Sequence, residues 1–227
     1  MDQTLKQVEE RPVRITSGRV TLDGNLAIPP SPCGVVLFAH GSGSGRYSVR
    51  NRYVAERLRE HGLATLLIDL LTLKEESLDA GNARYRFDIG LLAERLGIAT
   101  VWLGEEPETR HLNLGYFGAS TGAGAALVAA AQRPDLVWAI VSRGGRPDLA
   151  GPVLPHVRAP TLLIVGGDDE PVIEVNREAI ARLRCAKRMD IISGATHLFE
   201  EPGALEKVAG LAGEWFLDHL APEPAVG

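Results

Sequence analysis

The 227-residue sequence predicts an α/β protein with a mostly parallel central sheet, an antiparallel N-terminal hairpin and helices on both faces. Short, continuous apolar runs alternate with amphipathic helical segments over most of the chain, which is typical of parallel sheets covered on both faces. Over residues 12–28, in contrast, apolar and polar residues alternate, as in an antiparallel hairpin. We expect one domain over residues 1–227, with about 1–11 and 221–227 mobile.

The N-terminal hairpin is predicted from this alternation and from two glycine-containing breaks. Ser17-Gly18 and Asp23-Gly24 both interrupt the alternation, and both are predicted to be turns. The prolines within residues 29–32 then end strand pairing, because proline has no N–H to donate. The continuous apolar run Val35–Ala39 that follows predicts the first central parallel strand.

The rest of the chain alternates between helices and strands. Helices are predicted over residues 49–61, 88–103 and 123–132, after Pro171, and over a closing segment around residues 205–216. Strands are predicted over residues 64–71, 112–117, 137–141, 161–165 and 189–192. The segment 70–86 mixes polar and apolar residues and is a candidate flap over a cleft. The short segment between residues 142 and 161 leaves room for only a minimal lid.

Composition and charge exclude several classes of function. The net charge of −5, with no cluster of Lys and Arg free of acids, argues against nucleic-acid binding. No apolar run reaches the ~18–20 residues that span a bilayer, and the N-terminus lacks a signal-peptide pattern, so we expect a cytoplasmic protein without a membrane partner. Cys33 and Cys185 have neither metal nor redox spacing, and we expect no metal and no cofactor. The oligomeric state stays open.

Ser120 lies in the pentapeptide Gly118-Ala119-Ser120-Thr121-Gly122, which matches the G-x-S-x-G pattern of a nucleophile elbow. A predicted strand precedes it and a predicted helix follows it, so the serine hydroxyl would stand on a sharp turn above the sheet. The two glycines allow neighbouring backbone to approach without meeting a Cβ. The alternative is a plain tight turn before a helix of small residues; the flanking strand and helix favour the elbow.

A serine hydroxyl needs a general base within hydrogen-bond reach and a third group that orients the base. His197 follows the last predicted strand, at the carboxyl edge where open α/β sheets place their sites; the alternative is a solvated loop histidine. Asp168 and Asp169 follow the strand between Ser120 and His197, and either carboxylate can accept the Nδ1 proton of His197. Because both precede Pro171, capping of a helix is the alternative role.

Two backbone N–H groups are expected to stabilise the oxyanion that forms on a substrate carbonyl. One belongs to Thr121, the residue after the nucleophile, and the other to Ser42 in the glycine-rich stretch 40–45. That stretch could also be a phosphate cradle, but it lacks both the G-K-[ST] ending of a P-loop and the last glycine of G-x-G-x-x-G. We therefore expect no nucleotide, and we expect His40 to brace the loop.

The chain resembles the α/β-hydrolase superfamily and, within it, a dienelactone-hydrolase-like branch of small members with almost no lid. The resemblance spans about residues 12 to 220 and rests on four motifs, at residues 40–43, 118–122, 166–172 and 195–199. The family's G-x-x-D-x-x-V acid motif maps onto Gly166, Asp169 and Val172, which implies Asp169 as the triad acid. Dienelactone hydrolases proper use a cysteine nucleophile, and the serine at position 120 implies a serine esterase instead.

The sequence thus predicts a serine hydrolase that cleaves a small carboxylic ester or lactone through an acyl intermediate on Ser120. Asp169 and His197 complete the expected catalytic triad, and a small ester-type molecule is the expected partner. Two alternatives stay open. The same triad could hydrolyse acyl-thioesters or peptides, or the chain could be a noncatalytic binding module that keeps the fold.

Two arginines follow the strand that ends near Ser142. A planar guanidinium at this carboxyl edge can hold a carboxylate through two hydrogen bonds, so Arg143 and Arg146 are candidate substrate-binding residues. The alternative is that both are solvated loop residues that pair with Asp148.

Overall fold

The computed structural model describes residues 8–221, which contain one eight-stranded sheet in the order β1-β2-β4-β3-β5-β6-β7-β8. β1 pairs antiparallel with β2 and β2 antiparallel with β4, whereas all other pairs are parallel, which confirms the predicted fold class. The strands are β1 Glu10–Ser17, β2 Val20–Ala27, β3 Gly34–Ala39, β4 Leu63–Ile68, β5 Leu114–Ala119, β6 Val137–Arg143, β7 Thr161–Gly166 and β8 Lys187–Ile192. Of the ends expected to be mobile, residues 1–7 and 222–227 lie outside the described residues, and residues 10 and 11 belong to β1.

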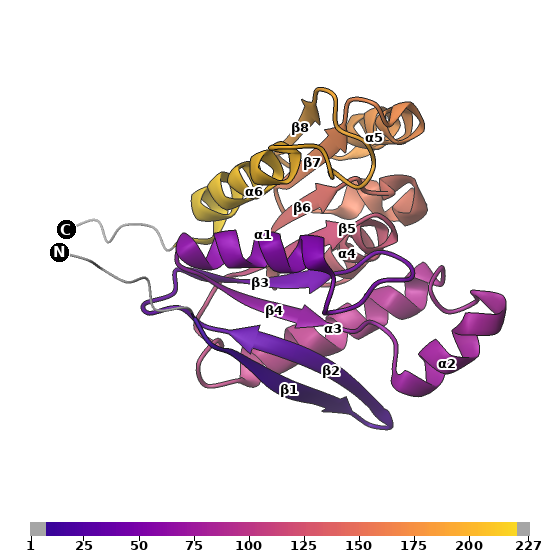
Figure 1. Ribbon diagram of the computed structural model, residues 1–227. Coiled ribbons are helices and arrows are strands. Elements are labelled where there is room, and N and C mark those ends of the chain that lie inside the picture. The colour runs from indigo at the N-terminus through magenta and orange to yellow at the C-terminus, as the bar shows by residue number, and fades with distance from the viewer. Residues whose placement is uncertain (1–7, 222–227) are drawn as a thin grey trace.

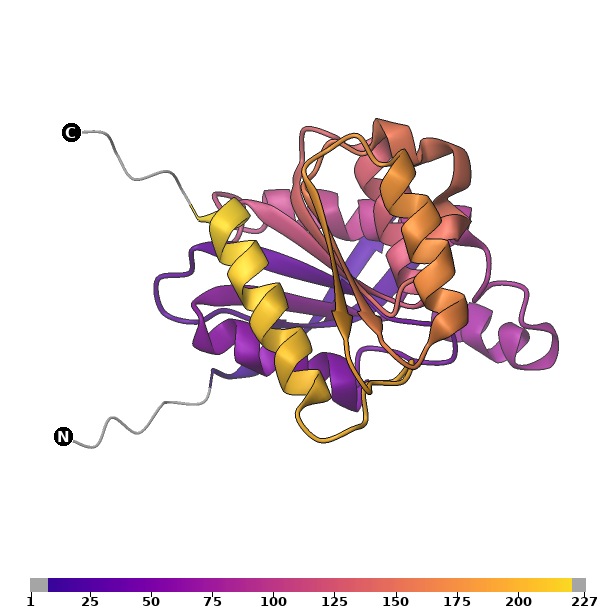
Figure 2. The ribbon, with the colours of Figure 1, turned by 90° about the horizontal axis from the view of Figure 1, so that it is seen from above.

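Helices cover both faces of the sheet (Figure 1, Figure 2). On one face lie α1 Val49–Glu60 and α6 Ala204–Leu220, which pack against each other. On the other lie α3 Ile89–Glu105, α4 Thr121–Gln132 and α5 Glu170–Arg182, with the 3₁₀ segment η1 Pro147–His156 between α4 and α5. α2 Leu73–Asn82 lies apart from both layers, beyond the carboxyl ends of β3 and β4 (Figure 1).

Each face of the sheet has its own apolar core, because the central strands are buried on both sides. The aromatic rings of Phe38 and Phe117 meet on the α1/α6 face with centroids 4.9 Å apart. On the α3/α4 face the Tyr116 hydroxyl lies 2.5 Å from that of Thr100, so the buried phenol keeps a hydrogen-bond partner. These cores hold the strand ends, and hence the loops that follow them, in place.

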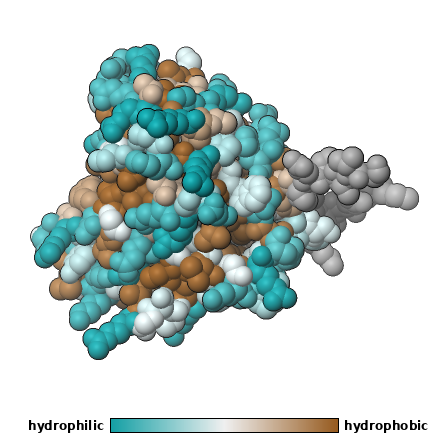
Figure 3. Space-filling model, turned by 180° about the vertical axis from the view of Figure 1, so that it is seen from behind, coloured by the Kyte–Doolittle hydropathy of each residue, from teal (hydrophilic) through white to brown (hydrophobic). Residues whose placement is uncertain are grey.

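The face of the molecule seen from behind carries hydrophilic and hydrophobic side chains interspersed (Figure 3). Within residues 8–221, no helix combines the length and the apolar character that crossing a membrane requires.

The predicted turn at Asp23-Gly24 is wrong, because both residues lie inside β2. Asp23 pairs with Arg14 of β1, and its carbonyl accepts the N–H of Asp69, 2.9 Å away. Gly24 faces Val13 and Ile68 so closely that a Cβ would lie 3.1 and 3.2 Å from their Cγ2 atoms. Pairing on both edges of β2 outweighs the local turn preference, and the hairpin has its turn at Ser17-Gly18 alone.

The candidate flap over residues 70–86 contains a helix that the sequence pattern did not predict. α2 begins at a complete capping box, in which the Thr72 hydroxyl accepts the N–H of Glu75 and the Glu75 carboxylate accepts that of Thr72. The helix ends at Ala83 in the left-handed conformation, with φ of 53°. Its position beyond β3 and β4 places it beside the loop that follows β3.

Candidate active site

Ser120 stands on a strained turn between β5 and α4. Its φ of 50° and ψ of −120° lie where side chains other than glycine are uncommon, a strain of about 1–3 kcal/mol. The flanking glycines make this turn possible, since a Cβ on Gly118 would collide with the backbone of Ala123 and one on Gly122 with the carbonyl of Ala39. The backbone is therefore that expected of a nucleophile elbow, and α4 packs directly onto the end of β3.

The structure joins Asp169 to His197. The Asp169 Oδ2 atom lies 2.7 Å from Nδ1 of the imidazole, in a hydrogen bond between a mostly buried carboxylate and a half-exposed ring. Asp169 occupies the N-cap position of α5, yet its side chain makes no capping hydrogen bond and is turned to His197 instead. Asp168 is exposed, and its backbone N–H donates to the Ala195 carbonyl at 2.9 Å, which ties the acid loop to the histidine loop.

Ser120 and His197 both pack against the end of β6, Ser120 at Arg143 and His197 at the residue that follows it. The Ser120 N–H donates to the carbonyl of Arg143 at 3.2 Å, and the next residue, Gly144, packs against the histidine so that a Cβ there would lie 3.5 Å from Cε1 of His197. No hydrogen bond between the Ser120 hydroxyl and His197 is present among the described residues. Such bonds are often long in free enzymes and shorten when substrate binds.

The two expected oxyanion donors are neighbours, one in the loop after β3 and the other at the first residue of α4. The loop after β3 turns at Gly41–Ser44, closed by a hydrogen bond of 3.2 Å from Ser44 N–H to the Gly41 carbonyl, with Gly43 left-handed at φ of 70°. The Ser42 N–H donates to Oγ1 of Thr121 at 2.9 Å. Ser42 and Thr121, the residues expected to supply the two donors, are thus in contact. In the free protein the Thr121 hydroxyl accepts the Ser42 N–H.

His40 braces this loop, as expected. Its Nε2 atom accepts the N–H of Leu70 at 3.0 Å, so the proton lies on Nδ1, which donates to the Gly41 carbonyl at 2.9 Å. Burial lowers the pKa of His40, against the raising influence of the Gly41 carbonyl and Asp69. The neutral ring therefore connects the oxyanion loop to the start of the flap.

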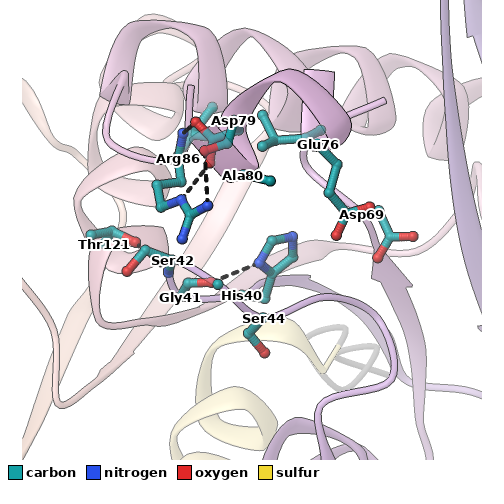
Figure 4. A pocket seen from close by; sticks show the side chains of 13 residues that line it. His40, Gly41, Ser42, Ser44, Asp69, Glu76, Asp79, Ala80, Arg86 and Thr121 are labelled. Carbon is teal, nitrogen blue, oxygen red and sulfur yellow. Dashed lines mark hydrogen bonds and ion pairs between the residues drawn. The ribbon is translucent and has the colours of Figure 1, made fainter. Parts of the chain in front are cut away.

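A cavity of about 300 Å³ lies between the oxyanion loop and α2 (Figure 4). Ser42 and Thr121 line one side of it, and Asp79 and Arg86 of the flap line the other. The Arg86 guanidinium is held by the Asp79 carboxylate and points into the cavity toward Ser42 and Thr121 (Figure 4). The volume of this cavity is at the lower end of the range for ligand sites, so the flap side of the site accommodates only small groups.

Sequence analysis missed the ion pairs that shape this cavity. Asp79 is buried and accepts the backbone N–H of Tyr85 and of Arg86 as well as the Arg86 side chain. Burial opposes ionisation of Asp79, but the hydrogen bonds to Arg86 and Tyr85 outweigh it and hold the pKa of this carboxyl below its ordinary value. Arg46 pairs in the same way with Asp69. The pairing of β3 with β4 brings Arg46 and Asp69 together, and the turn that follows α2 brings Asp79 and Arg86 together, so neither pair has a local sequence pattern.

The two candidate arginines, one at the end of β6 and the other just beyond it, have different surroundings. Arg146 donates to both carboxylate oxygens of Asp148, from Nε at 2.8 Å and from Nη2 at 2.7 Å, as the alternative interpretation expected. Arg143 is the last residue of β6 and is only 7% exposed, so it is not a solvated loop residue. Its Nε and Nη1 atoms are buried and have no hydrogen-bond partner among the described residues.

Within residues 8–221, no three His, Cys, Asp or Glu side chains are grouped so that they could hold a metal ion.

Comparison with known proteins adds independent evidence, although no family model matches the chain. The sequence is 64% identical to that of a dienelactone hydrolase from Anabaena variabilis, whose crystal structure matches this one with a TM-score of 0.93. The match covers 94% of this chain and 99% of the other. Est1E of Butyrivibrio proteoclasticus matches with a TM-score of 0.75 at 17% identity, over 91% of this chain and 98% of the other, which shows a shared fold alone.

Two curated relatives match from strains of Mycobacterium tuberculosis, each named "Putative phosphoribosyl transferase". They are 56% identical over 219 residues, which are 96% of this chain but 48% of the relative. The chain thus spans about half the length of the curated relatives it matches.

The sheet order, the strained serine turn and the structural matches define an α/β hydrolase. Within this class, the sequence identity of 64% to the dienelactone hydrolase, over nearly the whole of both chains, shows the family. The chain belongs to the dienelactone hydrolase family, and its fold is that of a hydrolase.

Proposed function

We propose that this protein is a serine hydrolase that cleaves small carboxylic esters or lactones through an acyl intermediate on Ser120. The observation that carries the proposal is the hydrogen bond of 2.7 Å between the Asp169 carboxylate and His197. Asp169 is at the N-cap position of α5, but its carboxylate makes this bond and no capping hydrogen bond. A capping role would turn the same side chain toward the N–H groups of α5. The strained elbow at Ser120 supports the proposal, since strain at a functional turn is retained when the surrounding structure requires it.

In this proposal each residue of the triad has one task. His197 removes the proton of the Ser120 hydroxyl as the oxygen attacks the substrate carbonyl carbon, and it then protonates the leaving alkoxide. Asp169 holds Nδ1 of the imidazole and stabilises the imidazolium that forms during attack. In the second half of the reaction His197 activates a water, which releases the acid and restores Ser120.

The oxyanion would be stabilised by the backbone N–H groups of Ser42 and Thr121. The N–H of Ser42 is bonded to the Thr121 hydroxyl in the free protein, so substrate binding would replace that acceptor with the substrate oxygen. The exchange costs little, because a hydroxyl rotates freely to another partner. One donor of this kind contributes about 2.7–4 kcal/mol to transition-state stabilisation in comparable sites.

Phosphoribosyl transfer is not proposed for this chain. The relatives with that name are about twice its length, and the half that it matches corresponds to a dienelactone hydrolase over nearly all of that structure. The glycine-rich loop after β3 carries neither a P-loop lysine nor the dinucleotide pattern.

The proposal is tested with p-nitrophenyl acetate and butyrate, together with a fluorophosphonate probe that labels activated serines. We expect wild type to hydrolyse both esters and to be labelled, and Ser120→Ala to lose both properties, with kcat falling about 10⁶-fold, as when the nucleophile of a comparable triad is removed. Thioester and peptide analogues of the same acyl groups show which leaving group is preferred.

The two adjacent aspartates provide a matched control. Asp169→Asn should lower kcat about 10⁴-fold, because it changes the tautomer that His197 presents, whereas Asp168→Asn should stay within a few-fold of wild type. Equal losses in the two variants, or labelling that persists in Ser120→Ala, would contradict the proposal.

A further inference from the structure

Asn176 of α5 is a polar side chain that is completely buried. Its Nδ2 atom donates one hydrogen bond to the carbonyl of Gly145 at 3.0 Å and another to the carbonyl of Val172 at 2.7 Å. Because both partners are acceptors, the nitrogen of the amide and not its oxygen must face them. The Oδ1 atom is buried and has no hydrogen-bond partner among the described residues. An amide with an unpaired buried oxygen adds little to stability, so its presence in the core needs a further reason.

The first of these two partners, Gly145, belongs to the segment 143–146, which holds both main-chain groups of Ser120. The Ser120 N–H donates to the carbonyl of Arg143 at 3.2 Å, and the Ser120 carbonyl accepts the N–H of Arg146 at 3.0 Å. The strained turn at the nucleophile is therefore set by the position of this segment, because bonds from both sides of the turn end in it.

The segment is fixed at its start by the sheet and at Gly145 by the amide. The Gly144 N–H donates to the carbonyl of Ile164 in β7 at 2.8 Å, and Gly144 then turns the chain with a left-handed φ of 51°. A Cβ on Gly145 would lie 2.7 Å from the Cβ of Ala123, so the segment packs closely against α4. The bond from Asn176 holds Gly145 within this packing.

The same amide also adjoins the other two residues of the proposed triad. Gly144 packs against His197, and a Cβ there would lie 3.5 Å from Cε1 of the imidazole. Val172 belongs to the first turn of α5, and its N–H donates to the carbonyl of Asp169 at 3.0 Å. The Asn176 side chain thus joins the helical turn that begins at the acid to the segment that contacts the nucleophile and the base.

We infer that Asn176 is a positioning residue for the proposed hydrolysis: its amide fixes the segment 143–146 to the first turn of α5 and so keeps the Ser120 hydroxyl within reach of His197. The inference rests on the proposed function for the reaction that this geometry serves, but the positioning can be measured without turnover. A displacement of about 1 Å caused by a change far from the chemistry can lower a rate about 100-fold. Because Asn176 is completely buried and does not contact substrate, its loss should lower kcat and leave KM nearly unchanged.

Asn176→Ala tests the inference, and Asn113→Ala is the matched control. The Asn113 amide also donates to a main-chain carbonyl, that of Leu220, at 3.0 Å, but Asn113 lies just before β5, at the opposite end of that strand from Ser120. With p-nitrophenyl butyrate we expect Asn176→Ala to lower kcat about 10- to 100-fold with KM within about twofold of wild type, and Asn113→Ala to leave both unchanged. A normal kcat in Asn176→Ala, a loss confined to KM, or equal losses in the two variants would overturn the inference.

Asn176→Ser separates the two bonds of the amide. A serine hydroxyl in a helix can donate to the carbonyl four residues earlier, which is that of Val172, but it is too short to reach Gly145. We expect Asn176→Ser to be more stable to urea than Asn176→Ala and to have the same low kcat. A wild-type kcat in Asn176→Ser would overturn the inference, since the bond to Gly145 would then be dispensable. This variant also takes the place of Asn176→Ala if the latter does not fold.

Amide hydrogen exchange measures the positioning without substrate. The N–H groups of Ser120 and Arg146 are bonded in the free protein, so their exchange reports how firmly the segment and the turn hold each other. We expect Asn176→Ser to accelerate exchange at both positions about 10-fold or more, and Asn113→Ala to leave it unchanged. Unchanged exchange in Asn176→Ser would overturn the inference even if kcat falls. If wild type hydrolyses no ester, the proposed function fails, and the exchange rates still decide whether Asn176 holds the turn.

Discussion

The arginines at the carboxyl edge of the sheet fall into two groups, on either side of the nucleophile strand β5. On the flap side, toward β3 and β4, Arg46 is paired with Asp69 and Arg86 with Asp79, and Asp69, Asp79 and Arg86 line the cavity. On the β6 side, Arg143 is more deeply buried than either of them and forms no ion pair with an acid within residues 8–221. Arginine thus occurs in two environments at this edge of the sheet. On the flap side it is paired with a carboxylate, and on the β6 side Arg143 is buried with two nitrogen atoms that have no partner among the described residues.

This difference in pairing separates the buried charges that stabilise the fold from those that do not. A buried arginine with its carboxylate stabilises the shape around it, and removing one partner leaves an uncompensated charge. A buried arginine without a carboxylate lowers stability, and such a penalty is typical of positions retained for binding. Removing one charge at a time on each side of β5 tests this contrast.

The largest difference should appear when each type of buried arginine is replaced by methionine. Arg95, which is 5% exposed and pairs with Glu75 at 2.7 Å, stands for the paired type. Arg95→Met should lower the free energy of unfolding by about 3–5 kcal/mol, because Glu75 loses its partner, whereas Arg143→Met should raise it by about 1–4 kcal/mol. Urea unfolding measures both, and a loss of stability in Arg143→Met would show that the guanidinium has a structural partner after all.

A smaller effect is expected from opening the flap-side pair. Asp79→Ala removes the acceptor of the Arg86 side chain and of two backbone N–H groups, so the loop between α2 and α3 should loosen and the cavity wall should shift. We expect kcat/KM for neutral esters to fall about 100-fold and protease cleavage within residues 73–88 to accelerate. Asp135→Ala, which removes an exposed partner of Arg158, is the control, and similar behaviour of the two variants would contradict a special role for Asp79.

The smallest effect concerns pH and His40, which links the two loops on the flap side. Because burial lowers the folded-state pKa of His40, below pH 6.5 the unfolded chain takes up a proton that the folded protein does not. Its contribution to the free energy of unfolding therefore falls as the pH drops from 6.5 toward the folded pKa. Thermal melts between pH 5 and 8 should show a shallower pH dependence for His40→Gln, whose amide can make both hydrogen bonds without titrating. An equal slope in wild type and His40→Gln would mean that other groups determine the pH dependence of stability.

Much of the fold and the order of the site residues were predictable from local pattern. The serine turn could be recognised because Gly118 and Gly122 have a steric reason to be glycine, and that reason is visible in five letters. That an acid after β7 meets His197 followed from the strand order, since loops that follow neighbouring parallel strands meet at one edge, whereas the choice of Asp169 over Asp168 came from the resemblance to the family's acid motif.

What could not be predicted depends on contacts between distant segments. Asp23-Gly24 looks like a turn, but β4 pairs with it and makes it a strand. The burial of Arg143 is hidden because the apolar run ends at Val141, while the strand continues to Arg143 against β7. The helix α2 did carry a local signal, the T-x-x-E capping box at Thr72, which went unrecognised because the segment lacks a regular apolar stripe.

The close packing of Gly122 on the carbonyl of Ala39 has a consequence for how this protein could change its substrates. The nucleophile turn and the loop after β3 are fixed to each other through main-chain contacts, so neither can be rebuilt without the other. The flap touches this unit through few bonds, above all the one from Leu70 to His40. New specificities are therefore most accessible by exchanging residues 73–88, which would leave the catalytic backbone untouched.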